Sequence, residues 1–397
     1  LILKLKEDKN LSRIAIIGGG IMGSSIAWNL AKTVAKEDLL VIEPDPTYEF
    51  AATPRAVGGI RFVQGLKENL EMSLYGCHVF KNFAHELGID EDIVDLNFHE
   101  CGYLFLGTKD QSKSFESNQK MLTGCGAEIL LLDKEKLKAL LPPFNFKDVE
   151  VGLYSPNDAR IDPYSALRGF KQAAINLGVE YKKDRVVGIN HDNRTVKSLK
   201  LESGALIPVE IIINAANCWA PEICRMVGMD VPIKPVRRQT FYFDMKKEIS
   251  KFPAIRDHTG LSVRPDGAGF ITGKTAVGGK AGFNWELDYR EFDDELWPLM
   301  ANRCSVFETI KYKGGWVGHY DQCLLDGNPI LGPWDNGLPN FFLAAGFSGH
   351  GLQHAPAISL ALSEQILYGN FKTFDLSLFS HKRVENNRPI EDLGPTP

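Results

Sequence analysis

An apolar stretch that runs directly into a glycine-rich turn constrains the fold of this chain most. Residues 14–17 are apolar and short enough for a buried strand, and the pattern Gly18-x-Gly20-x-x-Gly23 follows them. An amphipathic stretch over about 24–36 then predicts a helix. In such a turn the first glycine permits a tight bend, the second admits a pyrophosphate and the third lets the helix pack on the strand. Phosphates would lie at the helix N-terminus.

A second apolar stretch, residues 39–42, ends on Glu43. A right-handed crossover would place it parallel to the first strand, which completes a βαβ unit. An acid about 20 residues after the glycines accepts hydrogen bonds from ribose hydroxyls and disfavours a 2'-phosphate, so NADP is unfavourable. The same interpretation places Ile21, Met22 and Pro44 beside a dinucleotide. This motif alone does not distinguish FAD from NAD.

Composition narrows the class of partner. The chain has 397 residues and a formal net charge of -5 without a long basic run, so we expect a small-molecule ligand and no nucleic acid. The 7 cysteines form no C-x-x-C pair, which favours a reducing compartment and no metal site. No apolar run reaches the roughly 20 residues of a transmembrane helix, so we expect a soluble protein. Because the chain begins at Leu1, a targeting peptide could have been removed.

Further helices and strands are predicted from hydrophobic periodicity and from residues that begin or end helices. Helical patterns cover about 67–87, 162–177 and 353–367, and the second has Asp162 as N-cap, Pro163 after it and Gly178 past its end. Short strands at 185–189, 196–201 and 205–208 predict a β-meander that leads into an apolar strand at 210–214. Strand character at 237–244 and 270–273 predicts a second, mostly antiparallel sheet.

Several motifs along the chain resemble those of the D-amino-acid oxidase family of FAD enzymes, in the branch with sarcosine oxidase and dimethylglycine dehydrogenase. The resemblance covers nearly the whole chain and is carried by residues 16–20, 57–60, 213–216, 316–320 and 346–353. It implies an α/β fold in which a Rossmann-like FAD-binding domain of the glutathione-reductase type is interleaved with an antiparallel-sheet substrate domain. The FAD-binding domain would comprise 10–85, 150–225 and 320–390, and the substrate domain 86–149 and 226–319.

Position by position, the resemblance implies which residues hold FAD. Gly18, Gly20, Gly23 and Glu43 match positions that contact the ADP moiety, and Val187 matches one on the adenine side. Others match positions beside the flavin or the middle of the cofactor: Thr53, Arg55, Gly58, Gly59, Ala215, Ala216 and Trp219.

The glycine-rich stretch before the last helix would face the electron-rich edge of the flavin. Backbone amides and a positive helix end at this position stabilise a reduced, anionic flavin. The residues concerned are Gly346, Ser348, Gly349, His350, Gly351, Leu352 and Gln353.

Three residues match substrate positions of the family. Arg61 matches the arginine that binds a substrate carboxylate, for which a bidentate guanidinium is well suited. Tyr320 matches an active-site tyrosine of the sarcosine oxidase branch, and Gln353 stands where monomeric sarcosine oxidase has a carboxylate-binding lysine. The expected substrate is a small, N-substituted amino acid, oxidised by hydride transfer to the flavin to give an imine that water hydrolyses.

Two departures from the family bear on mechanism. Ile271 falls where sarcosine oxidase uses a lysine to promote reaction with oxygen, which favours a dehydrogenase over a fast oxidase. Cys323 lies near the position of a flavin-linked cysteine, and no histidine follows residues 51–53 as it does in covalent dehydrogenases, so we expect non-covalent FAD. The electron acceptor would be oxygen, an electron-transfer flavoprotein or a quinone-linked carrier.

Alternatives remain open from the sequence. A flavoprotein that serves chiefly as an assembly or scaffold factor for a respiratory complex, or an NAD-dependent dehydrogenase, would share the first motif. The i, i+4 pair His350 and His354 could face a metal, although no third ligand is evident. Arg237 and Arg238 could line the substrate cavity or be solvated. The compartment would be cytoplasmic for a bacterial source and the mitochondrial matrix for a eukaryotic one.

Overall fold

The computed structural model describes residues 13–35, 38–90, 92, 94–192, 194–245, 252–274, 280–392 and 394. One of its two large sheets has six strands in the order β19-β20-β13-β1-β2-β9, drawn from both ends of the chain. Here β1 pairs in parallel with β2, as the βαβ pattern predicted, and it also pairs in parallel with β13. The strands are β1 (Ile14–Ile17), β2 (Leu39–Ile42), β9 (Glu180–Lys182), β13 (Ile211–Asn214), β19 (Ile330–Pro333) and β20 (Phe341–Ala345).

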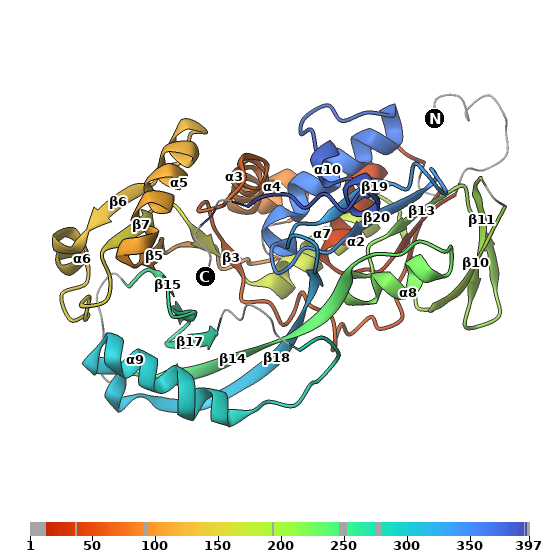
Figure 1. Cartoon of the computed structure of the whole chain (residues 1–397). Coiled ribbons are helices and arrows are strands. Elements are labelled where there is room, and N and C mark those ends of the chain that lie inside the picture. The colour runs from red at the N-terminus through yellow and green to blue at the C-terminus, as the bar shows by residue number, and fades with distance from the viewer. Residues whose placement is uncertain are drawn as a thin grey trace.

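Helix α2 (Ile21–Ala31) follows the glycine turn and is buried on every side as far as Leu30. It lies between α7 (Pro163–Asn176) and α10 (Gly351–Tyr368), as Figure 1 shows. Trp28 packs on Phe170 with ring centroids 5.5 Å apart, and Asn29 Nδ2 donates to Ser359 Oγ at 2.8 Å. The predicted amphipathic helix over 24–36 was therefore wrong in its bounds and its exposure, because α10, more than 300 residues later in the chain, covers the face expected to meet water.

The face of the six-stranded sheet opposite α2 packs against the predicted β-meander. Its strands are β10 (Val186–His191), β11 (Val196–Leu201) and β12 (Leu206–Pro208), and α8 (Ala220–Arg225) packs in the same apolar cluster. Asp162 caps α7 as predicted, since its side chain accepts from the amide of Ser165. The predicted helix over 67–87 is split at Asn82 into α3 (Lys67–Lys81) and α4 (Phe83–Leu87), where the Asn82 Nδ2 donates to the His78 carbonyl at 2.9 Å.

The other large sheet has eight strands in the order β18-β14-β17-β16-β15-β5-β7-β6. All its pairs are antiparallel except β15 with β5, which confirms the predicted second sheet. Figure 1 shows the long β14 and β18 running side by side from beside α9 toward the six-stranded sheet. The strands are β5 (Tyr103–Gly107), β6 (Leu130–Asp133), β7 (Val151–Ser155), β14 (Ile233–Asp244), β15 (Ala254–Asp257), β16 (Leu261–Asp266), β17 (Gly269–Lys274) and β18 (Lys311–Cys323).

Strand β7 departs from the expected domain ranges. It falls within the range 150–225 assigned to the FAD-binding domain, yet it pairs with β5 and β6 of the eight-stranded sheet. The chain therefore leaves the eight-stranded sheet only after Ser155. The expected boundary at residue 150 differs from this point because the pairing of β7 with two other strands is not visible in the local sequence.

The remaining elements connect the two sheets or cover them. A small sheet is formed by β3 (Gly59–Ile60), β8 (Ala159–Arg160) and β4 (His99–Glu100). The other helices are α5 (Ser112–Gly124), α6 (Lys134–Leu140), α9 (Trp297–Arg303) and α11 (Lys382–Glu385), besides short 3-10 or π segments. Within the described ranges no helix combines the length and apolarity needed to cross a bilayer.

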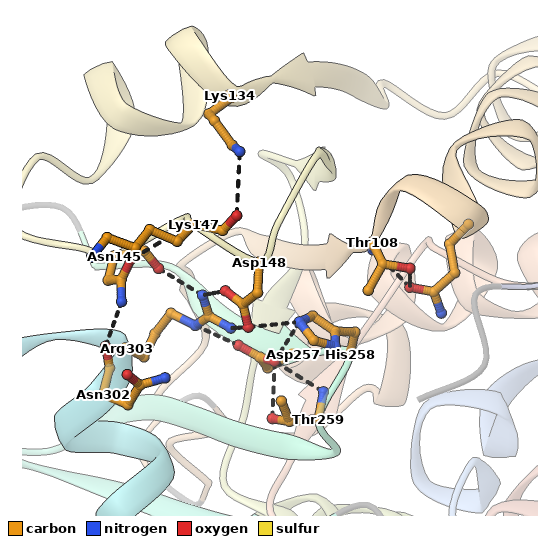
Figure 2. Close-up of polar contacts among 11 residues, drawn as sticks. Thr108, Lys134, Asn145, Lys147, Asp148, Asp257, His258, Thr259, Asn302 and Arg303 are labelled. Carbon is orange, nitrogen blue, oxygen red and sulfur yellow. Dashed lines mark hydrogen bonds and ion pairs between the residues drawn. The ribbon is translucent and has the colours of Figure 1, made fainter.

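A partly buried ion cluster fixes α9 to the eight-stranded sheet (Figure 2). Arg303, at the end of α9, donates through Nε to Asp257 at 2.7 Å and through Nη1 to Asp148 at 2.7 Å. His258 Nε2 lies 3.1 Å from the same Asp148 carboxylate. Burial alone would raise the pKa of Asp148, but the Arg303 bonds override it and lower this pKa to about 2.

Replacement of Arg303 by methionine should destabilise the protein strongly. The side chains of Arg303 and Asp257 are only 4% and 1% exposed, and removal of one partner of a buried pair costs about 3–5 kcal/mol. The urea unfolding midpoint measures the effect, and Arg290→Met, which removes an exposed pair with Asp288, is the matched control. Equal midpoints for the two variants would contradict this role of Arg303.

Candidate cofactor and active site

The glycine turn after β1 serves two distinct needs. Gly18 has φ +99°, and a Cβ on it would lie 2.7 Å from the Ala215 carbonyl oxygen; a Cβ on Gly23 would lie 1.9 Å from the Gly18 carbonyl oxygen. A Cβ on Gly20 would meet only Thr53 Oγ1, at 3.7 Å. Packing within the protein therefore requires the first and third glycines, whereas the absence of a side chain at the second leaves space for a ligand.

The N-terminus of α2 opens toward this space. No side chain caps it and no acidic residue lies in its first turn, and the Ile21 amide has only a long, 3.4 Å contact with Thr53 Oγ1. Uncapped amides and the positive end of the helix dipole favour an anion here. The turn therefore fits the pyrophosphate of a dinucleotide.

Glu43 lies at the end of β2 beside this turn. Its carboxylate accepts from the Gly19 amide at 2.8 Å and from the Asp45 amide at 2.9 Å. Burial raises the pKa of Glu43, and these two amide bonds oppose the rise. The Glu43 amide donates to the Lys182 carbonyl at 3.0 Å, which brings the segment 184–186 close to it.

A cavity of about 340 Å³ extends from Glu43 to Arg61 and lies within the usual size range of small-molecule sites. Most residues expected at the cofactor or substrate line it: Gly18, Gly20, Ile21, Met22, Glu43, Pro44, Thr53, Arg55, Gly58, Gly59, Arg61, Ala215, Ala216, Trp219, Tyr320, Gly349, Gly351, Leu352 and Gln353. Five expected residues are not in the lining: Gly23, Val187, Gly346, Ser348 and His350. Val187 is 43% exposed, and its neighbour Val186 lines the cavity instead.

The loop over residues 53–59 forms one wall of the cavity and is held by hydrogen bonds to backbone carbonyls. Arg55 donates to the carbonyls of Glu49 at 2.7 Å and Val317 at 2.8 Å, so its guanidinium holds this loop against β18. A Cβ on Gly59 would lie 2.2 Å from the Tyr103 hydroxyl oxygen. The absence of a side chain at Gly59 therefore allows the eight-stranded sheet to approach this loop.

The loop before α10 is held by a buried carboxyl that the sequence did not reveal. Asp321 Oδ2 accepts from the amides of Gly346 at 2.7 Å and Phe347 at 3.1 Å. Burial raises the pKa of Asp321 to about 7, against the opposing effect of these amides. The amide of Gly346 is thus bound within the protein, whereas Phe347, Gly349 and the start of α10 line the cavity.

Arg61 is held in place at the N-terminal end of α10. Its backbone amide donates to Gln353 Oε1 at 2.9 Å, and its Nη2 lies 2.8 Å from His350 Nε2. Because a guanidinium only donates, His350 Nε2 must accept. Burial and the field of Arg61 lower the pKa of His350 well below its usual range and that of His354 to about 3, so both rings are neutral at neutral pH.

Three further arginines line the cavity, namely Arg185, Arg238 and Arg256. Arg256, on β15, was not identified from the sequence, and Arg238, on β14, was considered only as one of two possibilities. The Arg238 guanidinium carbon lies 4.9 Å from the Tyr320 ring centroid. Arg237 points elsewhere, since it donates to the Glu286 carbonyl at 3.0 Å and is absent from the lining. Strand alternation distinguishes Arg237 from Arg238 only when the face of the sheet is known.

Three other sequence interpretations have structural outcomes. Ile271 is buried in β17 outside the lining, so its position gives no support to the argument about oxygen. Cys323 is also buried outside the lining, and its amide donates to Ser348 Oγ at 3.0 Å. His350 contacts Arg61, and His354 Nε2 lies 3.0 Å from Ser73 Oγ. No cluster of three metal-ligating side chains occurs among the residues described.

Comparison with known proteins agrees with this geometry. FAD-dependent oxidoreductase domain-containing protein 1 of Xenopus laevis is 31% identical over 95% of this chain and 83% of that protein. Human mitochondrial dimethylglycine dehydrogenase is 29% identical over 93% of this chain but only 44% of that protein. The structure of L-proline dehydrogenase from P. horikoshii superposes with a TM-score of 0.84 and 26% identity, covering 96% of this chain and all of that one.

The family model described as FAD dependent oxidoreductase (DAO) matches residues 13–365. This span includes the glycine turn, Glu43, Arg61 and the start of α10, so it takes in both ends of the cavity. The chain therefore belongs to the DAO family of FAD-dependent oxidoreductases, and its cofactor is FAD.

Proposed function

We propose that the protein oxidises the C–N bond of a small, N-substituted amino acid and passes the electrons to an acceptor other than oxygen. The observation that carries this proposal is the placement of Arg61, which lines the cavity while Gln353 and His350 fix its backbone and one side of its guanidinium. The remaining N–H donors of Arg61 would bind the substrate carboxylate.

The residues of the glycine turn would hold the FAD pyrophosphate, and Glu43 would bind the ribose. The first-turn amides of α10 would face the flavin ring, since this end has no side-chain cap. Binding is proposed to be non-covalent, because Cys323 is buried outside the cavity lining.

FAD supplies an acceptor for the two electrons and the hydrogen that leave the substrate as hydride. As the Cα–H bond breaks, the nitrogen lone pair forms the C=N bond, and water then hydrolyses the imine to a carbonyl compound and an amine. The nitrogen must be unprotonated for this step. Nearby guanidinium groups disfavour an ammonium and would lower the pKa of the bound amine.

The names of relatives support a dehydrogenase. Two of the proteins compared above are called dehydrogenases, one acting on dimethylglycine and the other on L-proline. Both names describe secondary or tertiary amino acids, which agrees with the N-substituted substrate proposed here.

Anaerobic addition of a suitable amino acid should bleach the flavin absorption of the purified holoprotein. The panel comprises sarcosine, dimethylglycine, proline derivatives and D-amino acids, and the visible spectrum before and after each addition is the measurement. Reoxidation by air should be slow compared with reoxidation by an artificial acceptor dye. A bound flavin that no member of the panel reduces would favour a scaffold role instead.

Arg61→Met should lower kcat/KM by roughly 30-fold or more, because loss of one partner of a desolvated charge pair costs about 2–5 kcal/mol. Flavin reduction rates at a series of substrate concentrations measure the effect. Arg168→Met, at an exposed position of α7, is the matched control. Equal kinetics of the two variants would show that Arg61 does not bind the substrate.

Gly20→Val should reduce the FAD content of the purified protein while the fold is retained. A side chain here meets little protein, with Thr53 Oγ1 at 3.7 Å from the Cβ, so it mainly occupies ligand space. The flavin-to-protein absorbance ratio and the circular dichroism spectrum are the two measurements. Gly23→Ala is the contrasting variant, expected to impair folding itself; normal flavin content in Gly20→Val would contradict the assignment of the pyrophosphate site.

A further inference from the structure

The loop between β20 and α10, residues 346–350, has a strained backbone. Gly346, Ser348 and Gly349 have positive φ values of +83°, +51° and +94°. Ser348 carries a side chain, and a residue other than glycine persists in this region only where its surroundings fix it. The loop leads directly into Gly351, the first residue of α10, so its conformation sets where the uncapped N-terminus of this helix lies.

Strand β18 supplies contacts that fix this loop. Asp321 Oδ2 accepts from the amides of Gly346 at 2.7 Å and Phe347 at 3.1 Å. The Asp321 carbonyl accepts from the Ser348 amide at 3.3 Å, and the Cys323 amide donates to Ser348 Oγ at 3.0 Å. Of these β18 groups, the Asp321 carboxylate is the one that a substitution can remove, because the other two belong to the backbone.

Asp321 also lies at the cavity itself. It is 2% exposed and lines the cavity together with Phe347 and Gly349. Asn217, another lining residue, forms a hydrogen bond to the Asp321 carboxyl group through its side chain. A Cβ on Gly349 would lie 2.6 Å from a carbon of the Tyr320 ring, so the loop packs directly on β18. A displaced loop would therefore change the cavity wall next to α10.

We propose that Asp321 is a positioning residue that holds the first-turn amides of α10 at the flavin, and so raises both the affinity for FAD and the reduction potential of the bound flavin. Amides and the positive end of a helix stabilise the negative charge of a reduced flavin. This inference rests on the part of the proposed function that places α10 at the flavin ring, and it does not depend on the substrate. Asp321 acts here as a hydrogen-bond acceptor.

The charge of Asp321 has the opposite effect on the flavin. A carboxylate at the cavity repels the negative charge of the reduced form and lowers its reduction potential. Burial raises the pKa of Asp321 to about 7, against the amides of Phe347 and Gly346, so only part of the population is ionised at neutral pH. Removal of the charge alone should therefore raise the reduction potential, whereas removal of the acceptor should lower it.

Two variants of Asp321 separate the acceptor from the charge. Asp321→Leu keeps a similar volume but leaves two buried amides without an acceptor, so the holoprotein should release FAD about tenfold more readily. Its ratio of reduced to oxidised flavin at a fixed potential should fall about tenfold, which corresponds to about 30 mV for a two-electron couple. Asp321→Asn keeps an acceptor oxygen and should retain FAD, with a reduction potential equal to or above that of the unmodified protein.

Both quantities are measured on the holoprotein without any amine substrate. Dilution followed by the fluorescence of released FAD gives the affinity, and anaerobic equilibration with a reference dye gives the reduction potential. Gln322→Leu is the matched control, since Gln322 is the next residue of β18 and lies outside the cavity lining. It should leave both quantities unchanged.

Unchanged FAD release and reduction potential in Asp321→Leu would overturn the inference. So would an Asp321→Asn variant that behaves like Asp321→Leu, because the acceptor would then have no effect. If Asp321→Leu does not fold, Ser348→Ala, which loses the contact with Cys323, should lower the potential by a smaller amount, and no shift there refutes the inference. Failure of every amine to reduce the flavin would refute the proposed oxidation alone, because the dye titration needs no substrate.

Discussion

The fold depends on the close approach of three backbone segments at the turn after β1. The Gly18 turn packs against the Ala215 carbonyl at the end of β13, and Gly23 packs against Gly18 itself. No side chain larger than hydrogen can be placed at either position without moving backbone. This contact fixes α2 against β1, and the buried α2 in turn requires α7 and α10 to cover it. The cavity then lies at the carboxyl ends of the parallel strands, where sheets of this kind bind ligands.

Features set by nearby residues could be predicted from the sequence. The β1–turn–α2–β2 order, the acid at Glu43 and the cap of α7 at Asp162 each depend on contacts within one local unit. The resemblance to a family extended these predictions to Arg61 and the start of α10, and the cavity brings both together.

Features that depend on distant pairing could not be predicted in this way. Arg256 carries no local signal, since one arginine in a short strand is most often a surface charge. Its place in the cavity lining follows from the parallel pairing of β15 with β5, over 140 residues earlier in the chain. The amide contacts of Asp321 and the burial of α2 have the same origin, because both require segments that meet only in the finished fold.

Two adjacent residues of strand β18, Tyr320 and Asp321, contact different parts of the protein. Tyr320 lies among the arginines of the cavity, whereas Asp321 binds the amides that shape the loop before α10. Because neighbouring side chains of a strand point to opposite faces, both positions are set by one register against β14. A slip of one residue in one direction would bring the Asp321 carboxylate to the Tyr320 position, and a slip in the other direction would bring the Tyr320 phenol to the Asp321 position. The shape of the pocket at Tyr320 and the position of the loop before α10 therefore depend on the same hydrogen-bond ladder between β14 and β18.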